Sequence, residues 1–449
     1  AQEENGMKRQ KNLLILLAVL AGLCLAILLV TGVQKHIDKI TTVDKDIVDL
    51  NADSVTKISW TSGGKTLTYE KTDDTWQQSD DAAFPVNQEK LQELLQRFAP
   101  LNAGFEISDV QDYSQYGLDA PEVTVTLTTT EGDTVVKFGN FSTMDSKRYV
   151  TLGDGTVYLI ADDVAGDLST DRDAYLRADS VPEYDTVTGI TAAGEVAFTA
   201  QYLPDATPLY TDTYDYYAVD GENYTALSTQ KIEGFLSDLA ALPYSDYATY
   251  QASQENLADY GLDTPTVTYT VQYTQDKTDG SFALALGKKG DTCYARMNDS
   301  KIIFKLTEDA YNDLTATDAN ALRPDEALSL DWDTVKSMTF TVDDTAYTVE
   351  HKGNTFTING DEVDFDAVKQ AVDGLKITEY NSETTDKKQE LAFTVTLDNK
   401  EHPELTVTIQ QYDGENCLVT LNGVTLGFEA RSNVVTLTEA VKAITLGLE

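Results

Sequence analysis

Hydrophobic and polar positions alternate along this chain in three similar cycles. The stretches ADSVTKISW, YDTVTGITA and WDTVKSMTF contain Asp53, Asp185 and Asp333, each followed by Ser or Thr, then by Val and then by alternating apolar and polar residues. Alternation with a period of two is the pattern of a strand that buries one face. The three stretches therefore predict one opening strand that is used three times.

An amphipathic helix is predicted after each opening strand. The apolar residues recur at i, i+3, i+4 and i+7 in all three copies: Leu91, Leu94, Leu95 and Phe98; Ile232, Phe235, Leu236 and Leu239; Val368, Ala371, Val372 and Leu375. Asn87, Ser228 and Asp364 each stand four residues before a stripe and are the predicted N-caps. Alternating strands return after the helices in PEVTVTLTT, PTVTYTVQYT and LAFTVTLDN.

Two of the copies share a hexapeptide between the helix and the next strand. It reads YGLDAP at 116–121 and YGLDTP at 260–265. Glycine allows a tight backbone turn and proline stiffens the start of a strand, so we expect a structural corner and not an active site. The third copy lacks the hexapeptide and has a shorter connection, which predicts a degenerate terminal unit.

The N-terminal region contains a long apolar run. Leu13 to Val33 are 21 residues without a charge, and a helix of that length spans about 31 Å, the thickness of a bilayer core. Lys8, Arg9 and Lys11 precede the run, and basic residues stay on the cytoplasmic side. A single-pass anchor explains this pattern better than a cleaved signal, a lipoprotein signal or a core helix.

These patterns divide the chain into six segments of α+β class. We expect a cytoplasmic N-terminus (1–12), a transmembrane anchor (13–33), a juxtamembrane linker (34–45) and three repeats (46–179, 180–326 and a degenerate 327–449). Each repeat is predicted to be an antiparallel sheet with one packed helix. The protein is thus expected at the cell membrane, with its C-terminal ectodomain outside the cytoplasm.

Charge and cysteine content narrow the possible functions. The chain has 75 acidic and 33 basic residues and a net charge of -42, which argues against nucleic-acid binding because phosphate contacts need clustered Lys and Arg. Cys293 and Cys417 fall at equivalent strand positions of different repeats. They are predicted to be buried thiols and not a disulfide.

No organised catalytic motif is present in the sequence. The 3 histidines are isolated, and the patterns H-E-x-x-H, C-x-x-C and G-x-S-x-G do not occur. We therefore predict no catalytic residue, no metal ligand, no cofactor and no enzymatic activity. The densest acidic stretch, DDVAGDLSTDRD from Asp162, is expected to be a solvated loop, with weak binding of divalent cations as the alternative.

The second repeat has extra residues between its opening strand and its helix, in YLPDATPLYTDTYDYY. If this segment is a strand, Tyr210, Tyr214 and Tyr216 share one face. Tyrosine suits recognition surfaces because it combines apolar area with a polar tip. These three residues and Tyr217 are the predicted binding residues, and an extended hairpin whose tyrosines cover the sheet is the alternative.

Several of these segments together resemble a known bacterial family. Trp76 in DDTWQQ, the helix NQEKLQELLQRF, YGLDAPEVTVTL, VVKFGN and GDGTVYLI are similar to domain-of-unknown-function family 4340, over most of Val55 to Leu314. The resemblance implies a membrane-anchored or exported protein associated with ABC-type transport systems. It supplies no catalytic residues.

The sequence thus favours a non-catalytic, membrane-anchored scaffold or accessory subunit of an ABC-type transport complex. Its expected partners are the membrane, through Leu13–Val33, and transporter subunits. One alternative is a module that binds extracellular or cell-wall glycans through the tyrosine-rich segment. A hydrolase with paired carboxylates is the second alternative.

Overall fold

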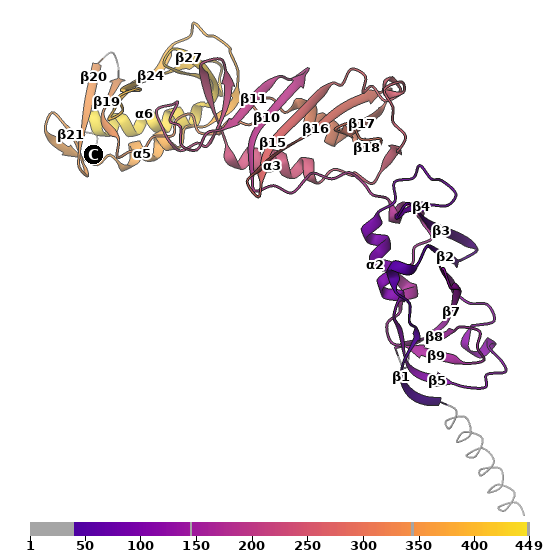
Figure 1. Ribbon diagram of the computed structural model, residues 1–449. Helices are drawn as coiled ribbons and strands as arrows, with labels where there is room; N and C mark the ends of the chain where they lie inside the picture. The colour runs from indigo at the N-terminus through magenta and orange to yellow at the C-terminus, as the bar shows by residue number, and fades with distance from the viewer. Residues whose placement is uncertain (1–39, 144–145, 343–344, 447–449) are drawn as a thin grey trace, which may run out of the picture. The chain divides into compact units, whose positions relative to one another are not determined.

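The computed structural model describes residues 40–143, 146–342 and 345–446. The chain forms two compact units, which divide between Ala178 and Asp179. The first unit holds one nine-stranded antiparallel sheet and the second holds two (Figure 1). The predicted anchor and the residues before it lie outside the described residues. Within the described part of the chain, no helix is long and apolar enough to cross a membrane.

The second repeat shows the common plan of these sheets. Its strands lie in the order β13-β12-β11-β10-β15-β16-β17-β18-β14, and every neighbouring pair is antiparallel. The strands before the helix are β10 (Thr186–Gly194), β11 (Phe198–Tyr202), β12 (Tyr216–Asp220) and β13 (Asn223–Leu227). Those after it are β14 (Tyr247–Thr249), β15 (Val267–Gln275), β16 (Thr278–Lys289), β17 (Thr292–Met297) and β18 (Ile303–Leu306).

The third repeat has the same strand order as the second, β22-β21-β20-β19-β24-β25-β26-β27-β23. Its first half comprises β19 (Val335–Val342), β20 (Thr345–Lys352), β21 (Thr355–Ile358) and β22 (Asp361–Val363). Its second half comprises β23 (Ile377–Tyr380), β24 (Gln389–Leu397), β25 (Glu404–Gln411), β26 (Asn416–Leu421) and β27 (Val424–Ala430). The expectation of a degenerate third unit is therefore wrong for the fold, although this copy lacks the hexapeptide.

The first repeat follows this plan except at its edges. Among the described residues it has no strand beyond β4 at one edge, and it has the extra strand β1 beside β5 at the other. Its order is β4-β3-β2-β6-β7-β8-β9-β5-β1. The strands are β1 (Ile40–Val48), β2 (Lys57–Ser62), β3 (Lys65–Thr72), β4 (Thr75–Gln78), β5 (Leu101–Ile107), β6 (Val123–Thr129), β7 (Gly132–Ser142), β8 (Lys147–Thr151) and β9 (Val157–Ile160). Because β1 pairs with β5, residues 40–45 belong to the sheet, and the linker predicted for 34–45 is wrong over this part.

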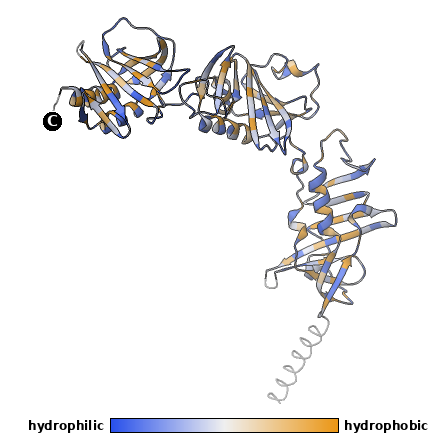
Figure 2. Cartoon of the chain, turned by 60° about the vertical axis from the view of Figure 1, so that its left-hand side comes forward, coloured by the Kyte–Doolittle hydropathy of each residue, from blue (hydrophilic) through white to orange (hydrophobic). Residues whose placement is uncertain are grey.

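One helix in each repeat joins the two halves of its sheet. These helices are α2 (Gln88–Phe98), α3 (Thr229–Ala240) and α5 (Asp366–Asp373). Each starts after a strand at one edge of the sheet and leads to a strand at or next to the opposite edge, so it must cross a sheet face. The predicted apolar stripes of all three are buried, and apolar and polar residues alternate along the strands (Figure 2).

Two of the three predicted helix caps are confirmed. The side chains of Asn87 and Ser228 accept hydrogen bonds from the backbone N–H groups of Lys90 and Lys231. In the third repeat the N-cap is Phe365 and not Asp364. Phe365 is buried and its ring stacks on another ring of the core. The Asp364 carboxylate still accepts a hydrogen bond from the Asp366 N–H at 3.1 Å, so it bonds the helix start from one residue before the N-cap.

Two further helices were not predicted from the sequence. The second repeat ends with α4 (Glu308–Ala316) and the third with α6 (Arg431–Leu446), so the expectation of one helix per repeat is wrong for both. At the corresponding place the first repeat has two short 3₁₀ segments, η3 (Val164–Asp167) and η4 (Arg172–Tyr175). Shorter 3₁₀ turns are η1 (Ala52–Ser54), η2 (Ser114–Tyr116) and η5 (Leu257–Asp259).

The shared hexapeptide is a structural corner, as predicted. Gly117 and Gly261 have φ of +68° and +67°, a left-handed conformation that favours glycine. A Cβ atom on Gly261 would overlap the carbonyl oxygen of Lys288, and one on Gly287 would overlap the carbonyl oxygen of Gly261. The corner therefore lies directly against the backbone of β16.

This packing gives a prediction for Gly261→Ala. The substitution adds both left-handed strain and a clash with strand backbone, so we expect a loss of at least about 2 kcal/mol in unfolding free energy. Gly290→Ala is the matched control because Gly290 has φ +60° but no atom within 4 Å of an added Cβ, and should cost about 1 kcal/mol. Calorimetric unfolding measures both, and equal losses would contradict the close packing of the corner.

Candidate functional site

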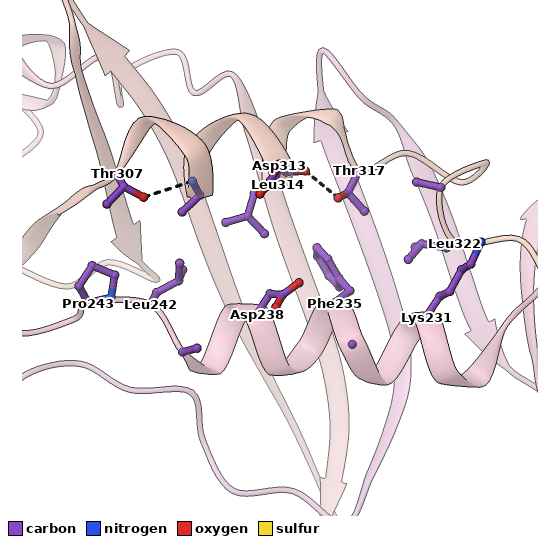
Figure 3. Close-up of a pocket in the computed structure, with 14 residues that line it drawn as sticks. Lys231, Phe235, Asp238, Leu242, Pro243, Thr307, Asp313, Leu314, Thr317 and Leu322 are labelled. Atoms are coloured by element: carbon purple, nitrogen blue, oxygen red, sulfur yellow. Dashed lines mark hydrogen bonds between the residues drawn. The ribbon is translucent and has the colours of Figure 1, made fainter. Parts of the chain in front are cut away.

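A groove lies between α3 and α4 in the second repeat. It encloses about 790 Å³. The two helices run antiparallel over the same sheet face, and apolar side chains point into the space between them (Figure 3). This volume falls in the range of ligand and peptide sites.

A buried tyrosine of the sheet holds both helices in place. The ring of Phe235 in α3 packs edge-on against Tyr269 in β15, with ring centroids 4.9 Å apart. The Tyr269 hydroxyl lies 2.6 and 2.8 Å from the carbonyl oxygens of Leu314 and Thr317, at the end of α4. Both helices are thus fixed to the sheet on either side of the groove.

The lining of the groove is apolar at its floor and acidic at its rim. Phe235, Leu314 and Leu322 are buried, whereas Gly234 is exposed and carries no side chain that could fill the space. The full lining is Lys231, Gly234, Phe235, Asp238, Ala241, Leu242, Pro243, Thr307, Ala310, Asp313, Leu314, Thr317, Ala321 and Leu322. The groove therefore offers apolar contact along a row of small residues.

The charged residues of the lining leave the groove with a net negative rim. Lys231 is paired with Asp325 at 2.7 Å. Asp238 and Asp313 are exposed, and among the described residues neither has a cation within ion-pair distance. A ligand that carries positive charge beside an apolar surface is complementary to this rim.

The third repeat shows the same arrangement in a closed form. There, α5 and α6 pack against one another, and Val434, Leu437 and Val441 of α6 are buried in the core of that repeat. The longer α6 thus covers apolar surface that the shorter α4 leaves uncovered in the second repeat. The groove is a feature of one repeat and not of the shared plan.

The groove was not predicted from the sequence, because α4 was not predicted. One signal was present: Thr307 is followed by Glu308 and Asp309, which is a typical helix start. The Thr307 hydroxyl oxygen accepts a hydrogen bond from the Ala310 N–H at 3.2 Å (Figure 3). A search for capping residues beyond the strands would have found this helix.

Two of the four predicted tyrosines lie where the second repeat meets the third. The Tyr214 hydroxyl forms a hydrogen bond with the Ser329 hydroxyl, and Tyr210 Oη accepts one from the Ser329 N–H at 3.1 Å. Tyr210 also packs against the core of the third repeat, and burial raises its pKa to about 12. Both tyrosines line a second hollow, described below.

The other two tyrosines are in the core of the second repeat. Tyr216 and Tyr217 begin β12 and are buried. The Tyr216 hydroxyl donates to Val187 O at 2.9 Å and the Tyr217 hydroxyl to Tyr214 O at 2.7 Å. The strand starts only at Tyr216, so the condition under which Tyr210, Tyr214 and Tyr216 share a strand face is not met.

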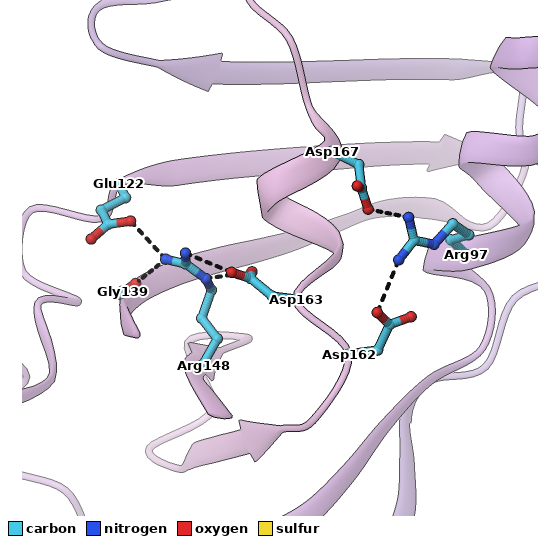
Figure 4. Close-up of polar contacts among 7 residues, drawn as sticks. All are labelled: Arg97, Glu122, Gly139, Arg148, Asp162, Asp163 and Asp167. Atoms are coloured by element: carbon cyan, nitrogen blue, oxygen red, sulfur yellow. Dashed lines mark hydrogen bonds and ion pairs between the residues drawn. The ribbon is translucent and has the colours of Figure 1, made fainter. Parts of the chain in front are cut away.

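The acidic stretch from Asp162 is tied to arginines of its own repeat. Arg148 in β8 is 8% exposed, and its guanidinium binds both carboxylate oxygens of Asp163, a carboxylate oxygen of Glu122 and the Gly139 carbonyl (Figure 4). Each nitrogen of the buried guanidinium therefore has a hydrogen-bond acceptor, which offsets the cost of removing the charge from water.

Arg97 engages two more carboxylates of the same stretch. Its Nη2 donates to Asp162 Oδ1 at 2.9 Å and its Nη1 binds Asp167 (Figure 4). Asp162, Asp163 and Asp167 thus have cationic partners within the chain. Over residues 40–143, 146–342 and 345–446, no group of three or more His, Cys, Asp or Glu is placed to hold a metal ion.

Cys293 and Cys417 are free and buried, as predicted. They are the second residues of β17 and β26, the equivalent strands of the second and third repeats. Cys417 lies opposite Glu429 in the neighbouring strand. Burial raises the pKa of the Cys417 thiol to about 11, which makes it an unreactive core residue.

Glu429 is the one fully buried carboxylate in the described part of the chain. It is 0% exposed, and its Oε1 accepts a hydrogen bond from Asn433 Nδ2 at 2.9 Å. Its Oε2 has no hydrogen-bond partner there. Burial raises the Glu429 pKa to about 7. Because Glu429 lines neither hollow, it gives no support to a hydrolase with paired carboxylates.

Glu429 makes the stability of the third repeat dependent on pH. A carboxyl whose pKa is raised on folding stabilises the protein at low pH, and this contribution is lost as the pH rises from about 4.5 to about 7. At pH 8 we expect the free energy of unfolding of Glu429→Gln to exceed that of the parent by up to about 3 kcal/mol. Near pH 4 we expect this difference to disappear. Urea unfolding across pH tests this, with the exposed Glu404→Gln as control; an advantage independent of pH would refute it.

Comparison with single proteins gives no relative on which an argument about this chain can rest. No curated protein matches it. One solved structure, described as "Ca2+-stabilized adhesin helps an Antarctic bacterium reach out and bind ice", aligns over 87% of this chain and 92% of that chain at 11% identity. Its TM-score of 0.08 carries no argument about fold or function.

The family match covers most of the three repeats. The profile described as Domain of unknown function (DUF4340) matches residues 76–253 and again residues 217–399. The two matches start within β4 of the first repeat and β12 of the second, and each runs into the next repeat, which agrees with a tandem array. The resemblance expected from the sequence is confirmed, and the chain belongs to the DUF4340 family of domains of unknown function.

Proposed function

We propose that this protein is a non-catalytic, membrane-anchored extracytoplasmic scaffold or accessory subunit, whose α3–α4 groove binds a helix of a partner in an ABC-type transport complex. The observation that carries the proposal is the open groove of the second repeat beside the closed helix pair of the third. The apolar run Leu13–Val33 with its basic flank supports the anchor.

The proposed occupant is an apolar helix with basic residues at its edges. A helix can lay an apolar face into a groove between two others, and α6 supplies such a face to α5 in the third repeat. The unpaired carboxylates of Asp238 and Asp313 at the rim favour Lys or Arg on the partner. The overall charge of -42 also favours encounter with a basic partner over an acidic one.

A glycan-binding module remains the second candidate, and it is less well supported. The hydroxyls of Tyr210 and Tyr214 are already bonded to Ser329, and Tyr216 and Tyr217 are buried. Sugars are bound by stacking on exposed rings and by free polar tips, and neither is offered by these four residues together.

The groove gives a test in which loss of binding is separated from loss of folding. In Gly234→Leu the added side chain enters the groove, yet nothing lies within 4 Å of the Cβ position, and replacing glycine inside a helix favours folding by up to about 1 kcal/mol. We expect a stable protein that loses its partner. Gln230→Leu, an exposed position of α3 outside the groove lining, is the matched control.

The measurement is site-specific crosslinking in the native membrane. A benzophenone side chain in place of Ala310, a lining residue, should crosslink to a transport-complex subunit through a peptide that has an apolar stripe and Lys or Arg. Gly234→Leu should lower the yield at least about fivefold, and Gln230→Leu should not. Crosslinks to no subunit, or equal yields from both variants, would refute the proposal.

A further inference from the structure

A second hollow lies at the junction of the second and third repeats, and we call it the junction cavity. It encloses about 460 Å³ within the second compact unit. Its walls come from the tyrosine-rich segment, from the connection after α4, and from the third sheet. Pockets of this size at the meeting of two domains are common sites for small ligands.

Arg323 is the cation of this cavity. Its guanidinium lies 3.7 Å from the ring centroid of Tyr380, whose hydroxyl donates to Pro324 O at 2.6 Å. The hydrogen bond to Pro324 thus holds the Tyr380 ring beside the guanidinium. Burial lowers the pKa of Arg323, although an arginine stays charged at physiological pH.

Arg323 is half-buried and differs from the buried Arg148 in what surrounds it. Arg148 is matched by the carboxylates of Asp163 and Glu122. Arg323 has no carboxylate within ion-pair distance among the described residues, even though the chain has 75 acidic residues. A desolvated cation without a counter-charge is costly unless a ligand supplies the charge.

The remaining walls define what the ligand must be beyond its charge. Leu405 is buried, Leu421 and Leu426 are half-buried, and Val424 is 67% exposed at the mouth. Glu326 also belongs to the lining and is exposed, so a negative charge is disfavoured near it. The ligand should therefore carry one negative charge, at the Arg323 end, on an apolar body.

We propose that the junction cavity binds a small organic carboxylate, with the carboxylate on Arg323 and the apolar body along Leu405, Leu421 and Val424. A carboxylate accepts two parallel N–H bonds from a guanidinium. Tyr380 contacts the Arg323 guanidinium through its ring and its hydroxyl, and among the described residues no carboxylate takes part in binding the guanidinium. Binding would also link the two repeats, since both contribute walls.

The probe is 3-phenylpropionate, with 3-phenylpropan-1-ol as the uncharged analogue and glucuronate as an acidic but polar one. Calorimetric titration uses the full chain in nanodiscs, and empty nanodiscs are the blank. We expect saturable binding of 3-phenylpropionate and at least tenfold weaker binding of both analogues, because each lacks one of the two features.

Variants then assign the site. Arg323→Gln should weaken 3-phenylpropionate at least tenfold. Arg177→Gln is the matched control. Arg177 has the same place in LRAD (176–179) as Arg323 has in LRPD (322–325), and it is exposed, so this variant should bind 3-phenylpropionate normally. Val424→Asp places a negative charge at the exposed mouth without touching the core, and should also weaken binding at least tenfold.

Three results would overturn the proposal. These are no saturable binding of 3-phenylpropionate, an alcohol that binds as tightly as the acid, and glucuronate that binds more tightly than 3-phenylpropionate. If Arg323→Gln unfolds in a thermal scan, Val424→Asp decides alone, and unchanged affinity in that folded variant would refute the assigned site.

Discussion

The helix that crosses each sheet is the constraint on which this architecture depends. In every repeat the chain completes its first set of strands at one edge and resumes at or next to the opposite edge. The connection has to pass over a sheet face, and it can do so without exposing apolar surface only if it is an amphipathic helix. This explains why the phase of the stripe is the same in α2, α3 and α5, while their surface residues differ.

The differences between repeats lie outside this plan. The first repeat joins β3 and β4 through a tight turn at Asp73 and Asp74, and the third repeat joins β20 and β21 at Gly353. In the second repeat the long segment 203–215 takes this place and delivers Tyr210 to the core of the third repeat. A longer loop costs little additional entropy, so the segment that replaces a hairpin turn can contact the neighbouring repeat without disturbing either sheet.

The features readable from sequence are those with a local physical cause. Strand alternation, helix phase and the caps at Asn87 and Ser228 depend on nearby residues, and the structure confirms them. The cap at Asp364 failed because Phe365 stacks on Phe356, with ring centroids 4.4 Å apart, and a contact across the core is not visible in a local pattern.

The candidate sites were less predictable for the same reason. Tyr216 and Tyr217 have the composition of a recognition surface, but their hydroxyls find carbonyl partners within their own sheet. Arg323 was not singled out from the sequence, because its role depends on Tyr380, more than 50 residues further on. The groove required knowing how α3 and α4 are spaced, which the pattern of neither helix contains.

One position that is equivalent in the three sheets can be compared with Arg323 as a candidate for ligand binding. Arg148, Cys293 and Cys417 are equivalent and face Ile160, Leu306 and Glu429. Arg148 is bound by carboxylates of its own repeat, and Cys293 and Cys417 are buried thiols, so none of the three calls for a ligand from outside. Arg323 is different, because the Tyr380 ring lies against its guanidinium and no carboxylate among the described residues lies within ion-pair distance of it. A polar side chain whose hydrogen bonds and charge are matched within the chain gives no indication of a ligand. A partly buried charge without a counter-charge is the stronger indication that a ligand binds there.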